Sequence, residues 1–105
     1  MSVIVTLRVS GDAAAFEEQV AAQADAIARI MDVAKRQGLI AHRWYGADGE
    51  FMAVDEWPDE ESFQAFFDEA QLDIRPVMQA AGVTSPPDVT FWRTLETNDA
   101  VGWNA

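Results

Sequence analysis

The stretch from Phe51 to Phe67, FMAVDEWPDEESFQAFF, constrains the fold more than any other part of the sequence. It begins with a strand-like run that stops at Pro58, and three acidic residues follow at once. Proline suits the first turn of a helix, and carboxylates there are stabilised by the positive end of the helix dipole. Apolar residues then recur at the spacing of one helix face, at Phe63, Phe66, Phe67 and Ala70. The stretch therefore predicts a strand that leads directly into a helix.

The same periodicities predict the remaining elements. Three further strands are predicted, at 2–9, 39–46 and 88–95. The first is rich in β-branched residues, and the second precedes the predicted turn at 47–49. A long helix is predicted from Asp12, a plausible N-cap, to about Gln37, with Gly38 just beyond its end. The order is then βαββαβ, which predicts an α+β, ferredoxin-like fold: a four-stranded antiparallel sheet with helices on one face.

A short additional helix is expected between the second long helix and the last strand. Asp73 can cap its start, and Pro76 is tolerated if it lies in the first turn. We expect residues 1–97 to form the domain and residues 98–105 to form a C-terminal tail, whose Trp103 could dock on a neighbouring copy.

The turn between the second and third strands decides which side chains meet on the sheet. If residues 47–49 form a three-residue loop with Gly49 left-handed, Arg43 shares a face with Asp55. If only Ala47 and Asp48 form the loop, His42 and Trp44 join that face instead. We prefer the three-residue loop, because Asp-Gly in its last two places suits a type I turn followed by a bulge.

The composition excludes several classes of function. The chain has 105 residues, with 18 acidic and 7 basic side chains and a net charge of -11, so it should repel nucleic acid. It has no cysteine, which excludes disulfides, thiolate metal sites and thiol nucleophiles. No apolar run approaches transmembrane length and no signal peptide is visible, so we expect a cytoplasmic protein that does not bind membranes.

The segment HRWYGADGEFMAVDEWPDEESFQAFF, residues 42–67, resembles the antibiotic-biosynthesis monooxygenase superfamily, the dimeric α+β barrels. The local mark is an acid, one spacer and a tryptophan at the end of the third strand, here Asp55-Glu56-Trp57. Residues 82–94, GVTSPPDVTFWRT, are similar to small actinobacterial members. The resemblance implies a homodimer that closes two sheets against each other, with a cleft between sheet and helices in each subunit.

Quinone-forming members of this superfamily oxidise aromatic polyketides with oxygen and without metal or flavin, so the resemblance implies no cofactor. Members that degrade haem use an asparagine on the first strand, a tryptophan in the second helix and a histidine beyond it. Here the first asparagine is Asn98, Phe66 stands where the tryptophan belongs, and no histidine follows His42. Haem degradation is therefore not expected.

We predict His42, Asp55 and Trp57 as the catalytic residues. His42 is the only histidine and could act as a base toward a phenol or enol, although a lone histidine is more often a half-buried strand residue. Asp55 lies on a strand side that is otherwise apolar, so it must be paired or face a cavity. Its partner is Arg43 in the preferred register, as a salt bridge, or His42 in the alternative register, as an acid–base pair.

Substrate-binding roles are predicted for Arg43, Tyr45, Phe66 and Trp92, against the alternatives of core packing for the aromatic rings and solvent exposure for Tyr45. Two functions fit the sequence. One is a cofactor-independent monooxygenase acting on a hydrophobic aromatic or polyketide-like molecule. The other is a non-catalytic small-molecule-binding or assembly module of the same fold.

Overall fold

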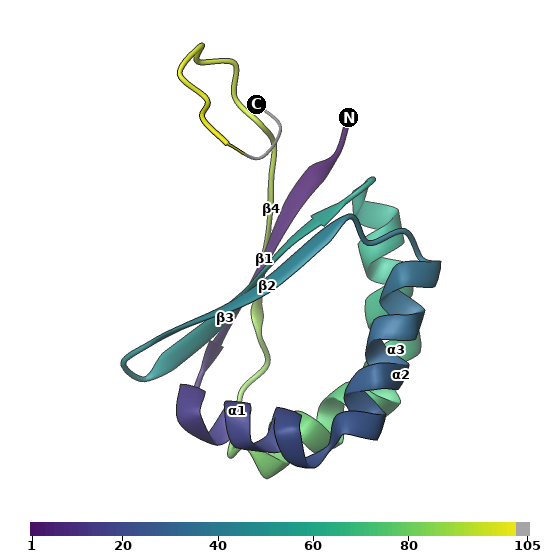
Figure 1. Cartoon of the computed structure of the whole chain (residues 1–105), viewed down its shortest axis with the longest axis vertical. Coiled ribbons are helices and arrows are strands. Elements are labelled where there is room, and N and C mark those ends of the chain that lie inside the picture. Colours follow the sequence, from purple (N-terminus) through teal and green to yellow (C-terminus); the bar gives the residue numbers. More distant parts are fainter. Residues whose placement is uncertain (103–105) are drawn as a thin grey trace.

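A twisted four-stranded antiparallel sheet lies against three helices, all on one of its faces (Figure 1). The computed structural model describes residues 1–102. Its elements are β1 (Val3–Ser10), α1 (Ala13–Ala22), α2 (Ala24–Arg36), β2 (Ala41–Ala47), β3 (Glu50–Trp57), α3 (Glu60–Ala80) and β4 (Asp88–Trp92). The strands are ordered β2-β3-β1-β4. This arrangement confirms the predicted α+β, ferredoxin-like fold.

Strand alternation separates the two faces of the sheet. On β1, Val5, Leu7 and Val9 are buried and face the helices, whereas Arg8 lies exposed on the outer face. The buried face packs against an aromatic cluster in which Phe63 is fully buried, with its ring 5.7 Å from that of Phe91. Burying one such ring contributes about 1.5–3 kcal/mol, so this cluster fixes α3 on the sheet.

The single long helix predicted over 12–37 is wrong. The chain leaves helical geometry at Gln23 (φ -113°, ψ 45°), and α1 and α2 form an arc over the sheet (Figure 1). The predicted cap is present, because Asp12 accepts a hydrogen bond from the backbone N–H of Ala14 at 2.9 Å. The bend lets the two helices follow the twisted face of the sheet. The residues around Gln23 contain no local sequence signal that predicts it.

The separate short helix predicted from Asp73 is also wrong. The α3 helix runs without a break through Pro76. Asp73 does not cap a helix; its carboxylate accepts from Arg29 of α2 at 2.9 Å. Pro76 removes the donor for the carbonyl of Leu72, and because Leu72 is exposed, water can solvate that carbonyl.

The preferred hairpin register is wrong. His42 and Trp44 share a face with Asp55, as in the alternative, but the loop of Ala47 and Asp48 given for that alternative is wrong as well. Ala47 pairs with Glu50, so the loop contains only Asp48 and Gly49, and Gly49 adopts φ +75°. A glycine is needed there because other residues rarely adopt a left-handed conformation. The shorter loop turns the side chains at even positions of β2 toward the helices.

Packing explains why this register is favoured. It places Trp44 beside Phe16 of α1, with ring centroids 4.6 Å apart, and beside Phe51 at 5.8 Å. The other register would send this indole to the outer face and would bring Tyr45 inside. It also pairs His42 with Asp55 across the two strands.

Beyond β4, residues 93–102 form no helix or strand and extend away from the sheet (Figure 1). Val101 is exposed. The predicted docking residue Trp103 lies outside the described residues. Within residues 1–102, no helix is long and apolar enough to cross a membrane.

Candidate functional site

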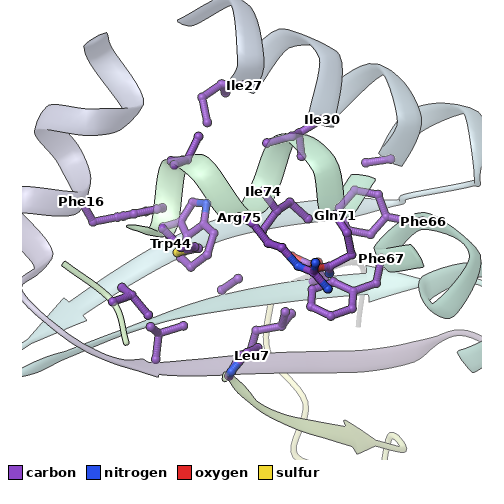
Figure 2. Close-up of a pocket in the computed structure, with 18 of the residues that line it drawn as sticks. Leu7, Phe16, Ile27, Ile30, Trp44, Phe66, Phe67, Gln71, Ile74 and Arg75 are labelled. Carbon is purple, nitrogen blue, oxygen red and sulfur yellow. The ribbon is translucent and has the colours of Figure 1, made fainter. Parts of the chain in front are cut away.

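A cavity of about 610 Å³ lies between the sheet and the helices. This volume is in the range of sites for small molecules. Its walls are predominantly apolar, and Figure 2 shows side chains from α2 and α3 above the sheet and Trp44 near Phe16. Apolar lining residues include Leu7, Phe16, Ile30, Trp44, Phe66 and Ile74.

A chain of hydrogen bonds borders this cavity on the sheet side. Nδ1 of His42 lies 2.6 Å from one carboxylate oxygen of Asp55. The other oxygen of Asp55 accepts a hydrogen bond from the indole Nε1–H of Trp57 at 3.2 Å. Asp55 is only 4% exposed, so these two bonds compensate its carboxylate for the loss of water.

This geometry selects one tautomer of His42. An ionised carboxylate can only accept hydrogen bonds, so Nδ1 must carry the proton that it donates to Asp55. Nε2 of the neutral ring then carries a lone pair. Among the described residues, every buried side-chain nitrogen or oxygen has a partner, whereas Nε2 has none; this atom is therefore accessible. The arrangement can hold a base at the cavity wall.

Trp57 lies at the same side of the cavity as Asp55. Its side chain is one of those that line the cavity, although no part of it is exposed to solvent. It contacts the site through the hydrogen bond to Asp55 and through the ring of Phe66. The three residues predicted as catalytic are thus brought together, with Asp55 hydrogen-bonded to both His42 and Trp57.

The four residues predicted to bind substrate are divided between the two faces of the sheet. Phe66 lines the cavity, with its ring centroid 5.2 Å from that of Trp57. The strand register places Arg43, Tyr45 and Trp92 on the outer face, away from the cavity. Trp92 donates its indole N–H to Thr6 there, at 2.9 Å. Tyr45 borders a separate hollow beside α1.

Several cavity residues were not predicted as site residues from the sequence, among them Trp44, Gln71 and Arg75. Trp44 was excluded by the preferred register. Gln71 and Arg75 line the cavity from α3. The prediction divided this helix at residue 72, so it assigned these two residues to different helices. Their spacing of four residues would have placed them on one side of a continuous helix.

Comparison with known proteins gives matches in structure alone. No protein-family model matches the chain, and no curated protein is similar to it in sequence. Among solved structures, a protein from Bordetella bronchiseptica assigned as an antibiotic biosynthesis monooxygenase has a TM-score of 0.65 and 16% identity, covering 90% of this chain and 98% of the other.

SnoaB, a cofactor-independent oxygenase from Streptomyces nogalater, has a TM-score of 0.59 and 20% identity, covering 94% of this chain and 98% of that protein. NE2512 from Nitrosomonas europaea, a protein of unknown function, has a TM-score of 0.56 and 23% identity and covers 96% of both chains. The match extends over nearly the whole length in each case. The chain therefore has the fold of the antibiotic biosynthesis monooxygenase-like proteins.

Proposed function

We propose that this protein is a cofactor-independent monooxygenase that acts on an aromatic or polyketide-like molecule, with His42 as the base. The observation that carries the proposal is the 2.6 Å contact between His42 and the buried Asp55, with Nε2 left accessible at the wall of an apolar cavity. The fold shared with SnoaB, a cofactor-independent oxygenase, supports the same reaction class.

The reaction would begin with proton transfer. Nε2 of His42 accepts a proton from an acidic CH₂ group, and Asp55 stabilises the imidazolium that forms. The carbanion, delocalised into the aromatic system of the substrate, transfers electrons to dioxygen. In the balanced reaction, CH₂ and O₂ give C=O and H₂O: the carbon is oxidised, one oxygen atom is retained, and the other leaves as water with both hydrogens.

Oxygen consumption with anthrone tests this proposal. Replacing a general base costs roughly 10²- to 10⁴-fold in rate, so His42→Gln should reduce oxygen uptake by that factor. Arg43→Gln, on the opposite sheet face, is the matched control and should retain the rate. Unchanged uptake in folded His42→Gln protein would refute the role of His42.

The same experiment separates the enzyme from a non-catalytic binding module. A binding module would hold anthrone in the cavity, detectable by quenching of Trp44 fluorescence, without any oxygen uptake above the uncatalysed rate. An enzyme would show both the fluorescence quenching and oxygen uptake above the uncatalysed rate.

The proposal includes a second copy of the chain on the outer face of the sheet. Tyr45 and Trp92 are 46% and 53% exposed there, and a partner would cover them. Val54 lies near the middle of this face, between Thr6 and Arg43. Sedimentation should give a dimer at micromolar concentration and a monomer for Val54→Asp; a stable wild-type monomer would contradict this part.

A further inference from the structure

The cavity carries a cationic side chain on the wall opposite the base. Of the lysines and arginines in residues 1–102, only Arg75 lines it. Figure 2 shows Arg75 and Gln71 reaching from α3 into the space between the helices and the sheet, close to Phe67. Arg75 donates its Nε–H to the amide oxygen of Gln71 at 3.2 Å.

The acidic residues of the site do not neutralise Arg75. Within the described part of the chain, no carboxylate lies within 4.0 Å of its guanidinium. The neighbouring acids of α3 are bonded to α2 instead: Asp73 accepts from Arg29 at 2.9 Å, and Glu69 from Arg36 at 2.5 Å. Asp55, the one acid among the residues that line the cavity, is occupied by two hydrogen bonds.

Arg75 is therefore held at Nε, while its two terminal amino groups have no partner among residues 1–102. These groups form a planar donor pair that matches the two oxygens of a carboxylate. The amide NH₂ of Gln71 is a further donor beside them, because its oxygen is already used. In a chain of net charge -11, this is a local positive site at the solvent-exposed edge of an apolar cavity.

We propose that Arg75, positioned by Gln71, binds a carboxylate of the ligand, so that the ligand is an apolar aromatic acid. Its rings would fill the apolar part of the cavity, and its carboxylate would lie at α3, across from His42. This inference rests on the proposed function only for the reaction at His42. The binding of an aromatic carboxylate can be measured without turnover.

The probes are 2-naphthoate and its neutral analogue 2-naphthamide, which have the same rings and a planar substituent of the same size. Titration is followed by tryptophan fluorescence at about pH 8, where an ordinary carboxyl group is ionised. Wild-type protein should bind naphthoate roughly tenfold or more tightly than naphthamide, because the charge-assisted bidentate contact is absent for the amide.

Arg75→Met keeps the apolar stem and removes the charge, so it should abolish the preference for naphthoate and leave naphthamide binding nearly unchanged. Arg75→Lys should retain part of the preference, because it keeps the charge without the planar fork. Arg93→Met removes an arginine that does not line the cavity and serves as the control. Arg75 is exposed, so its replacement should not unfold the protein, which a thermal melt of each variant verifies.

Equal affinity of the wild type for the two probes, an unchanged ratio in Arg75→Met, or no binding of naphthoate at millimolar concentration would each overturn the inference. Failure of the proposed function gives a different pattern: naphthoate binds in an Arg75-dependent manner, but anthrone causes no oxygen uptake. Oxygen uptake that depends on His42, together with a probe ratio independent of Arg75, refutes the carboxylate site alone.

Discussion

Replacing Asp55 with asparagine should invert the tautomer of His42. The indole of Trp57 can only donate, so the single oxygen of Asn at this position must turn toward Trp57. The NH₂ group then faces Nδ1 of His42, which becomes the acceptor, and the ring proton moves to Nε2. The variant keeps the shape and both hydrogen bonds of the site but loses the lone pair at Nε2.

The energetic cost to the fold should be modest. Hydrogen bonds to a charged group contribute about 1.5–3 kcal/mol each and neutral ones about 0.5–1.5 kcal/mol, so two bonds that lose their charge cost about 2 kcal/mol in unfolding free energy. Loss of the base should reduce oxygen uptake roughly 10²- to 10⁴-fold. Activity would thus fall far more than stability.

Nitrogen NMR of the imidazole gives a direct assay, because His42 is the only histidine in the chain. At about pH 9, above the range in which ordinary imidazoles titrate, the wild type should show the proton on Nδ1 and Asp55→Asn should show it on Nε2. No substrate is required, so this result is independent of the proposed reaction.

A second substitution tests whether Trp57 fixes the orientation of the amide at position 55. Adding Trp57→Phe removes the donor that fixes the amide, so Asn at position 55 can turn its oxygen back toward His42 and restore the proton to Nδ1. The rescue should appear as a mixture of tautomers or a return to the wild-type form. An Asp55→Asn protein that keeps its proton on Nδ1 would show that Trp57 does not orient residue 55.

Three further substitutions test the packing and the helix start. Gly46→Ala would place a Cβ atom 2.9 Å from that of Ala13, so urea denaturation should show a loss of about 1–3 kcal/mol, which Ala13→Gly in the same chain should largely reverse. Phe63→Ala should cost about 3–5 kcal/mol in the same assay, since the ring is fully buried; a loss below about 1 kcal/mol would contradict the packing. The N–H of Ser62 lowers the pKa of Asp59 below its ordinary value of 3.8, so this carboxylate stabilises the fold above that value and the contribution is lost as pH falls through the lowered pKa. Asp59→Ala should therefore have a lower melting temperature than the wild type at neutral pH. Its melting temperature should also fall less than that of the wild type as the pH is lowered, and an equal fall in both proteins would refute the cap.

The sequence was sufficient for the fold and insufficient for the register. Apolar periodicity identifies β1, β3 and the start of α3, because each of these has one apolar side. On β2 both sides carry an aromatic and a titratable residue, since Trp44 and His42 alternate with Tyr45 and Arg43. The apolar pattern of β2 therefore cannot show which side of the strand faces the helices. The tertiary contacts of Trp44 determine that side.

The position of the base on an edge strand has a consequence for the dynamics of the site. Among residues 1–102, β2 pairs with β3 alone, so it can open locally at a lower free energy than the central strands. Such an opening separates His42 from Asp55 while the rest of the core stays intact. A ligand held in the cavity should oppose this opening, so amide hydrogen exchange should slow more on β2 than on β1 when the ligand binds.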